Sequence, residues 1–209
     1  MDIKKDIIRK ILKQKGFSED QIENSQISLT EETNSNLFQV SVPISAKKFI
    51  KDVLIDELGA VVKISPWLSF ISISSGIEFL GKCIDTNNPT DWNISGVSRS
   101  NFDHAVNSLD SLTKYRPLLP KNQFDLYGEF RCGLVHSCAP KDKISLSHGL
   151  HEQRNLVNTN GVINFNADEL YQDFKSACEE VINMIFQELN KMNNAKLHIN
   201  LTVNIEKPK

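Results

Sequence analysis

Residues 65–84 read SPWLSFISISSGIEFLGKCI, and their pattern sets the expected architecture. Ser65 followed by Pro66 is typical of a helix start, because serine favours the N-cap and proline is tolerated at the first helical position. Apolar residues then recur around most of the circumference for about five turns. A helix of this kind must be covered by other elements, so the sequence predicts a central helix in a helical protein.

Further segments carry apolar residues at helical spacing, and several have recognisable boundary residues. The expected helices are 2–15, ended by Gly16; 45–58, ended by Gly59; 100–112, with Ser100 and Asp103 arranged as in a capping box; 121–136; and 166–192, capped by Asn166 and Glu169. The polar segment 18–35 is expected to be an excursion that joins the first helix to the body of the protein.

Short alternating segments predict strands outside these helices. Residues 144–148 and 162–165 flank a polar connection that ends in Asn160-Gly161, a dipeptide typical of tight turns, so we expect a β-hairpin insertion at about 143–165. Segments 37–42 and 197–205 also alternate. The second of them is expected to pair with the first or with another subunit.

The expected fold class is therefore mainly α, an antiparallel helical bundle with a β-hairpin insertion and short peripheral strands. The expected organisation is an appendage of helix and linker or strand at 1–43, a helical domain at 44–193 and a C-terminal strand and tail at 194–209.

Composition limits the function classes. The chain has 209 residues and a formal net charge of −2, which excludes a strongly basic nucleic-acid binder and leaves only a local binding patch. No apolar stretch approaches the roughly 20 residues that span a bilayer, and the first residues lack the apolar core of a signal peptide. We therefore expect a cytoplasmic protein without a membrane partner.

The four cysteines, which are scattered, are expected to be reduced thiols. Cys132 and Cys138, with His148 and His151 downstream, raise the alternative of a zinc site. Their C-x5-C spacing does not fit the short loops of structural zinc sites. We therefore expect no metal and no cofactor.

One run combines a permanent cation with a group that titrates near neutral pH. Residues 126–137 read LYGEFRCGLVHS, in which Arg131 can bind phosphate oxygens and His136 can transfer a proton. Five steps along a regular helix turn the two side chains about 140° apart. Gly133 between them marks a distortion or a close approach of another segment.

A structural interpretation of this run stays open. Arg131 could pair with an acidic neighbour such as Glu129 or Asp125, and His136 could interact with the carbonyl groups at a helix C-terminus.

The same run, late in a helical body and followed by one more long helix, resembles the HEPN superfamily of nucleotide-binding and ribonuclease domains. The mark of that family is an arginine four to six residues before a histidine, and the resemblance covers about residues 44–193. It implies a homodimer in which two Arg/His motifs meet, and a metal-independent endoribonuclease. Arg131 would stabilise charge on the transition state, and His136 would act as general base or acid toward the ribose 2′-hydroxyl. Many active members carry a polar residue after the arginine, where this chain has Cys132.

Several residues are candidates for substrate binding or support of the motif. They are Cys132, Ser137, Glu78, Tyr127 and Lys141. Glu78 lies in the most apolar helix, so we expect an intramolecular partner for it, and Arg131 is one candidate. Residues 114–154 contain seven Lys and Arg but only four Asp and Glu, and this local excess of positive charge favours the approach of RNA.

The expected partners are RNA or a nucleotide, a second copy of the chain and an antitoxin or defence partner. Two rivals remain. One is a non-catalytic HEPN-like module for nucleotide or RNA binding or for dimerisation, and the other is a helical protein without a ligand.

Overall fold

The chain forms two compact units in the computed structural model. Unit 1 combines residues 1–45 with 196–209, and unit 2 contains residues 46–195. Along the chain, unit 2 is therefore inserted into unit 1. The structure describes residues 2–29, 37–85, 97–120, 124–149, 154–187 and 197–204.

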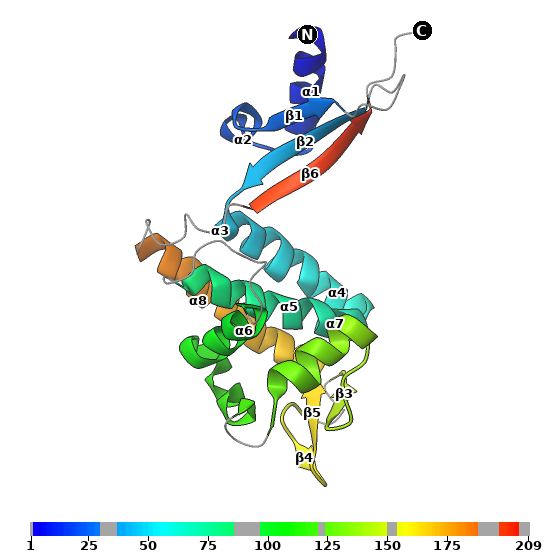
Figure 1. Ribbon diagram of the computed structural model, residues 1–209, viewed down its shortest axis with the longest axis vertical. Helices are drawn as coiled ribbons and strands as arrows, with labels where there is room; N and C mark the ends of the chain where they lie inside the picture. The colour runs from blue at the N-terminus through cyan, green and yellow to red at the C-terminus, as the bar shows by residue number, and fades with distance from the viewer. Residues whose placement is uncertain are drawn as a thin grey trace. The chain divides into compact units, whose positions relative to one another are not determined.

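Unit 1 contains a three-stranded antiparallel sheet and two helices (Figure 1). Its elements are α1 (Asp2–Gln14), α2 (Glu19–Glu23), β1 (Gln26–Leu29), β2 (Leu37–Ile44) and β6 (Leu197–Asn204). The strand order is β1-β2-β6, so the last strand pairs with β2, one of the two pairings proposed from the sequence. The excursion expected at 18–35 contains α2, whose start is a capping box of Ser18 and Gln21, and β1.

The core of unit 1 forms where the apolar face of helix α1 packs against the apolar face of strand β2. Phe38, Val40 and Val42 alternate along β2 and are buried together with Ile8 and Leu12 of α1. The chain leaves α1 at Gly16, whose φ of 84° lies in the left-handed region that glycine adopts most readily.

Unit 2 begins with one helical stretch of three parts. These are α3 (Ala46–Phe49), the π-helical segment η1 (Ile50–Glu57) and α4 (Leu58–Ile64). The predicted stop at Gly59 is wrong, because Gly59 lies inside α4. A Cβ atom there would come within 2.5 Å of the Tyr171 hydroxyl oxygen, and that hydroxyl donates a hydrogen bond of 2.6 Å to the carbonyl oxygen of Ile55. Gly59 thus allows a close approach rather than ending the helix.

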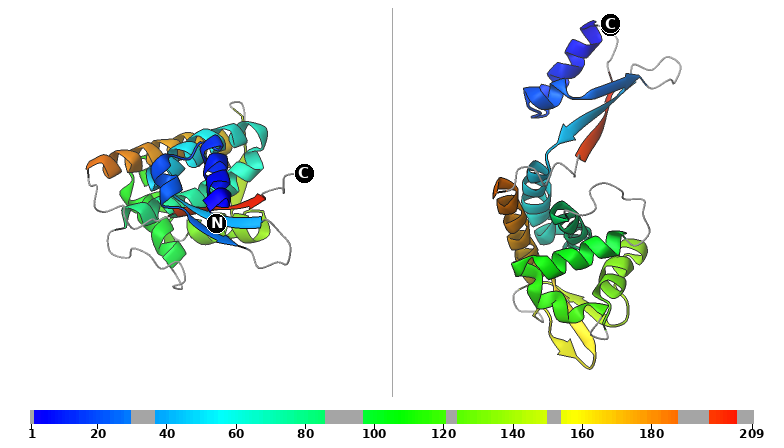
Figure 2. Two further views of the ribbon diagram at one scale, coloured as in Figure 1. Left: turned by 90° about the horizontal axis from the view of Figure 1, so that it is seen from above. Right: turned by 60° about the vertical axis from the view of Figure 1, so that its left-hand side comes forward.

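The predicted central helix is confirmed. Helix α5 (Pro66–Ile84) packs against α4, α6 (Val97–Ser108), α7 (Gly133–Ser137) and α8 (Ala167–Gln187), as Figures 1 and 2 show. Gly81 allows a close approach of α5 and α6, since a Cβ atom there would overlap the backbone carbonyl of Asn101. None of the helices in the described residues combines the length and apolarity needed to cross a bilayer.

Helix α6 starts earlier than the sequence suggested. It begins at Val97, so Ser100 is not an N-cap and the predicted capping box with Asp103 is wrong. The first turn places Arg99 where it pairs with Asp125, and this tertiary contact extends the helix beyond its local boundary signal. The chain continues through the 3-10 segment η2 (Asp110–Leu118) and reaches the π-helical segment η4 (Tyr127–Cys132), which runs directly into α7.

The small sheet of unit 2 differs from the predicted hairpin. Its strands are β3 (Ile144–Ser147), β4 (Asn158–Thr159) and β5 (Val162–Asn166), in the order β3-β5-β4. Strands β3 and β5 pair in parallel, so a hairpin between them is wrong. The Asn160-Gly161 turn does form, with φ values of 54° and 84°, but it joins β5 to the short strand β4. The protein is thus mainly α with small sheets.

Candidate functional site

The Arg/His run lies on a short helix made of η4 and α7. Asp125 stabilises the start of this helix, because its Oδ1 atom accepts a hydrogen bond of 3.0 Å from the backbone of Gly128. The helix ends at Ser137, near the predicted end at His136, and Cys138 closes it in a left-handed conformation with φ of 54°. Residues 121–123 of the predicted helix lie outside the described residues.

Gly133 marks a close approach, as predicted. A Cβ atom at this position would lie 2.8 Å from the carbonyl oxygen of Ala139 and 3.1 Å from the backbone nitrogen of Lys141. The same backbone nitrogen donates a hydrogen bond of 3.0 Å to the carbonyl oxygen of Glu129. The segment that follows α7 therefore folds back across the helix and brings Lys141 beside η4.

Arg131 forms an ion pair with Glu78 of α5. Its Nη2 atom lies 2.6 Å from Glu78 Oε2, and the two side chains are only 14% and 7% exposed. The intramolecular partner expected for Glu78 is confirmed, whereas pairing of Arg131 with Glu129 or Asp125 is wrong. The Glu78 Oε2 contact lacks the alignment of a hydrogen bond, and the buried Arg131 Nε atom has no hydrogen-bond partner. We therefore treat the contact as an ion pair with incomplete hydrogen bonding.

Tyr127 lies between this ion pair and a second arginine. The guanidinium carbons of Arg99 and Arg131 lie 4.7 Å and 5.4 Å from the centre of the Tyr127 ring, within the range of cation–π contacts. Burial raises the pKa of the Tyr127 hydroxyl, and the nearby Arg131 opposes this shift. The nearby Cys132 and Glu78 side chains raise this pKa further. Cys132 thus lies close to Tyr127, which precedes it by five positions on the π-helical turn.

Arg99, which no sequence motif indicated, is linked to these residues through Asp125. The two side chains form a bidentate pair with distances of 2.7 Å and 2.8 Å. The hydrogen bonds from Arg99 lower the pKa of Asp125. Asp103 lies near the same guanidinium, but burial raises its pKa and its Oδ1 atom has no hydrogen-bond partner. No local spacing joins Arg99 to Asp125, which are 26 positions apart.

We call this group the arginine cluster. Its members are Glu78, Arg99, Asp103, Asp125, Tyr127, Arg131 and Cys132. It gathers two cations and three carboxyl groups around one aromatic ring at the junction of α5, α6 and η4. Such an arrangement can hold an arginine in a fixed position and place it beside a stacking surface.

The other predicted site residues lie outside this cluster. His136 is exposed near the end of α7, and within the described part of the chain its imidazole makes no hydrogen bond or ion pair. Ser137 and Lys141 are also exposed. The structure thus brings Glu78, Tyr127 and Cys132 together with Arg131 but leaves His136 in different surroundings.

The alternative of a zinc site finds no support in the described residues. Among them, no group of three or more His, Cys, Asp or Glu side chains is placed to hold a metal ion. Cys138 and His148 are exposed, and His151 lies outside the described residues.

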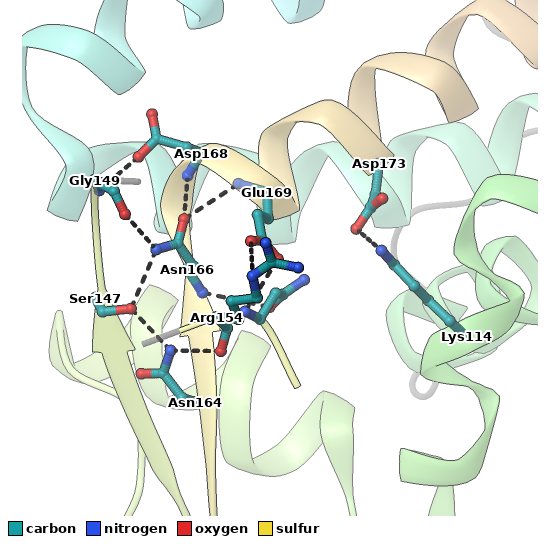
Figure 3. A network of polar contacts seen from close by, with 10 residues as sticks. Lys114, Ser147, Gly149, Arg154, Asn164, Asn166, Asp168, Glu169 and Asp173 are labelled. Carbon is teal, nitrogen blue, oxygen red and sulfur yellow. Dashed lines mark hydrogen bonds and ion pairs between the residues drawn. The ribbon is translucent and has the colours of Figure 1, made fainter. Parts of the chain in front are cut away.

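A second polar network lies at the start of α8 and is built mainly from amides (Figure 3). The predicted N-cap is confirmed, because Asn166 Oδ1 accepts hydrogen bonds from the backbone nitrogens of Asp168 and Glu169. The amide nitrogen of the same residue donates to Ser147 and to the carbonyl oxygen of Gly149. Residues 188–192 of the predicted helix lie outside the described residues.

Comparison with known proteins identifies no relative of this chain. No family model matches it, and no curated protein or solved structure is significantly similar to it.

Proposed function

We propose that this protein is a metal-independent endoribonuclease of the HEPN type. The proposal rests on the resemblance of residues 44–193 to that superfamily and on the Arg131 and His136 pair. The mainly helical unit 2 and the position of the pair on a short helix before α8 agree with it. We expect the protein to act in the cytoplasm in a toxin, defence or RNA-processing setting, with an antitoxin or defence protein as a candidate partner.

The reaction would use the ribose 2′-hydroxyl as the nucleophile. A histidine in the role of general base takes the hydroxyl proton, and the 2′-oxygen forms a bond to phosphorus. The bond from phosphorus to the 5′-oxygen breaks, and that oxygen receives a proton from a general acid. Arg131 stabilises the charge that develops on the phosphate oxygens. The products are a 2′,3′-cyclic phosphate and a 5′-hydroxyl, so no water, metal or oxidant is consumed.

The observation that carries the proposal is the availability of His136. An exposed imidazole without a protein partner can reach substrate and exchange protons, whereas a structural histidine is normally hydrogen-bonded. Arg131 is held by Glu78 in a mostly buried position, so its cation is fixed before substrate binds. Since the two side chains have different surroundings in one chain, we propose a homodimer whose motifs form a composite site.

The best rival is a non-catalytic module that binds RNA or a nucleotide, or that serves dimerisation. Glu78 already offsets the charge of Arg131, and Cys132 lies close to Tyr127. Both observations favour a structural role for the motif helix, which is the short helix formed by η4 and α7. In this alternative, the exposed His136 and Lys141 would contact the ligand without any bond being broken.

The variant His136→Ala distinguishes the endoribonuclease from the non-catalytic binding module. The side chain is exposed and unpaired among the described residues, so its removal is expected to leave stability within about 0.5 kcal/mol of the wild type. Varied single-stranded and structured RNAs are incubated with each protein in the presence of a chelator. We expect loss of cleavage in His136→Ala and full activity in His148→Ala, which removes another exposed histidine.

Wild-type protein that cleaves RNA no faster than His136→Ala would contradict the proposed nuclease activity. Retention of labelled RNA in a fluorescence anisotropy titration would then support the binding module. Arg131→Ala is a poorer probe, because it leaves the buried Glu78 without its cation. Arg131→Lys keeps the charge and loses the bidentate geometry, so we expect a folded protein with reduced cleavage.

A further inference from the structure

Helix α1 and the residue after it concentrate positive charge on the surface of unit 1. Residues 5–15 contain five Lys or Arg but only one acidic residue, Asp6, and all six of these side chains are exposed. The chain as a whole carries a formal net charge of −2, so its remaining residues are acidic on balance. The positive charge of α1 is therefore a local feature, which is what a protein of this composition needs in order to bind a polyanion.

Three of these cations form a row along the helix. Lys5, Arg9 and Lys13 are four positions apart, and residues at this spacing lie on the same side of a helix, about 6 Å apart along its axis. We call these three residues the α1 stripe. Each nucleotide of a nucleic-acid strand carries one phosphate charge, so a row of cations can contact several phosphates of one strand. Arg9 can also bind two oxygens of one phosphate at once.

The packing of unit 1 leaves mainly charged and polar surface on the exposed side of α1. Ile8 and Leu12 are buried with Val40 and Val42 of β2 (Figure 1). The apolar face of α1 is thus used by the fold, whereas a membrane-surface helix inserts that face into the lipid. Among the described residues of α1, Ile7 is the only exposed large apolar side chain, and protein interfaces have apolar centres depleted in Lys. The stripe therefore fits a phosphate backbone better than a membrane or a protein partner.

The cations of the stripe are available to a ligand. Within the described residues, Lys5 and Arg9 form no ion pair or hydrogen bond. Lys13 pairs with Glu19 of α2, but the two side chains are 69% and 66% exposed. A pair this exposed contributes little to stability, so the Glu19 carboxylate can give way to a phosphate group.

We propose that the α1 stripe is a docking surface of unit 1 for the phosphate backbone of RNA. The choice of RNA among polyanions rests on the proposed function, because an endoribonuclease holds its substrate through nucleotides on either side of the cleaved bond. The contacts are to phosphates, so binding is independent of base sequence and weakens as salt is added. The stripe raises the affinity of the protein for RNA and takes no part in the cleavage step.

Removal of the three charges tests the stripe. Full-length wild type and the triple variant Lys5→Gln, Arg9→Gln, Lys13→Gln are titrated against labelled single-stranded RNA, and fluorescence anisotropy is measured at several salt concentrations. The RNA is 2′-O-methylated, so it lacks the nucleophile and is not cleaved during the titration. Each phosphate contact contributes about 0.7 to the slope of log K against log salt. We therefore expect the slope to become shallower by about 2, and the affinity at about 0.1 M salt to fall about 100-fold.

Three exposed lysines of unit 2 give a matched control. Lys48, Lys51 and Lys63 lie on the helical stretch from α3 to α4, and Lys48 forms an exposed ion pair with Asp52. The control therefore also removes three exposed cations, one of which has a carboxylate partner. Joint replacement of the three lysines by Gln is expected to leave the affinity within about threefold of wild type. A loss as large as that of the stripe variant would overturn the proposal, because binding would then follow total charge rather than α1.

Folding and loss of binding must be told apart. Circular dichroism and the thermal midpoint of each variant are measured, and we expect both to match wild type because the substituted side chains are exposed. Arg9→Gln changes a single exposed side chain and is expected to lower the affinity about 5-fold at about 0.1 M salt, so the proposal is testable without the triple variant. Arg9→Lys keeps the charge and should bind within about twofold of wild type. Equal losses in the two Arg9 variants would overturn the phosphate contact.

The outcomes also separate this surface from the proposed nuclease. Stripe-dependent binding of RNA by a protein that cleaves none would support the stripe and remove the nuclease. With cleavable RNA, we expect the triple variant to show a raised KM and an unchanged kcat, because the stripe stabilises substrate and transition state equally. A folded triple variant that binds RNA like wild type would overturn the stripe while the nuclease stands. Stripe-dependent binding to polyglutamate or to phosphatidylserine vesicles, as tight as binding to RNA, would overturn RNA as the partner.

Discussion

The two polar groups of unit 2 satisfy their hydrogen bonds to different degrees. In the amide network, Asn164 donates to Ser147 and to the carbonyl oxygen of Arg154, while Asn166 caps α8. Among the described residues, four buried side-chain atoms have no hydrogen-bond partner, and three of them belong to the arginine cluster. These three lie on Glu78, Asp103 and Arg131, and the fourth lies on Asn101 of α6.

The difference indicates different roles. Buried polar atoms are nearly always satisfied in native proteins, so a complete network such as the one around Asn166 is explained by stability alone. Buried polar atoms without hydrogen bonds lower the stability of the folded protein, and so does a buried ion pair with incomplete hydrogen bonding. Such unfavourable arrangements are found mainly at functional sites. The amides hold β5 and α8 together, whereas the arginine cluster holds the Arg131 cation in place on the proposed catalytic helix.

The largest effect is expected from breaking the Arg131 and Glu78 pair. Arg131→Ala leaves a buried carboxylate without its cation and should lower the free energy of unfolding by about 3–5 kcal/mol. The double replacement Glu78→Leu with Arg131→Met removes both charges and should return to within about 2 kcal/mol of wild type. Urea denaturation measures both. An Arg131→Ala protein as stable as wild type would show that the pair is not closed in solution.

A smaller loss is expected from the amide network. Asn166→Ala removes the N-cap of α8 and leaves its partners near Ser147 and Gly149 unsatisfied, so we expect a loss of about 2 kcal/mol. Asn158→Ala removes one exposed hydrogen bond to Gly161 and serves as the matched control. Urea denaturation should show its loss to be under about 1 kcal/mol. Equal losses in both variants would contradict the structural importance of the network.

Local signals predicted the parts of the fold that depend on neighbours in sequence. The continuous apolar pattern of 65–84 identified the central helix, and Asn166 followed by Glu169 identified the start of α8. The Asn160-Gly161 turn was placed correctly, but its partner strand was wrong. Strand β5 runs parallel to β3 because β4 and its turn come between them, and nothing in the composition of the fourteen residues 148–161 specifies that direction.

The candidate site was predictable only in part. Glu78 could be suspected because a carboxylate in an apolar helix needs a partner, and Arg131 proved to be that partner. Arg99 could not be found, since its pairing with Asp125 is a tertiary contact between α6 and the start of the motif helix. The π-helical turns could not be predicted either. They are short, so the apolar residues in them still recur at the spacing of an α-helix.

Asp125→Asn tests the exposed part of the arginine cluster. The Arg99 and Asp125 side chains are each 38% exposed, so solvent limits the expected loss at pH 7 to about 1 kcal/mol. The pKa of Asp125 is lowered, and its contribution is therefore present above the ordinary carboxyl pKa of about 4 and lost as the pH falls through the lowered value. Urea titrations at pH 7, 5 and 3 should show the variant and wild type converging in acid. A difference that persists undiminished at pH 3 would contradict the ion pair.

The smallest effect, with the opposite sign, is expected from Asp103→Asn. Burial raises the pKa of Asp103, so the native state is penalised as the pH rises through this raised value, while Arg99 offsets part of the penalty. The variant should be more stable than wild type by about 0.5 kcal/mol at pH 7, and the gain should shrink toward pH 4. The same urea titrations measure it. A loss of stability at pH 7 would mean that the Asp103 carboxylate stabilises the protein by pairing with Arg99, as Asp125 does. The arginine cluster would then be an ordinary ion-pair network, without the unfavourably buried carboxylate that distinguishes it from the amides at the start of α8.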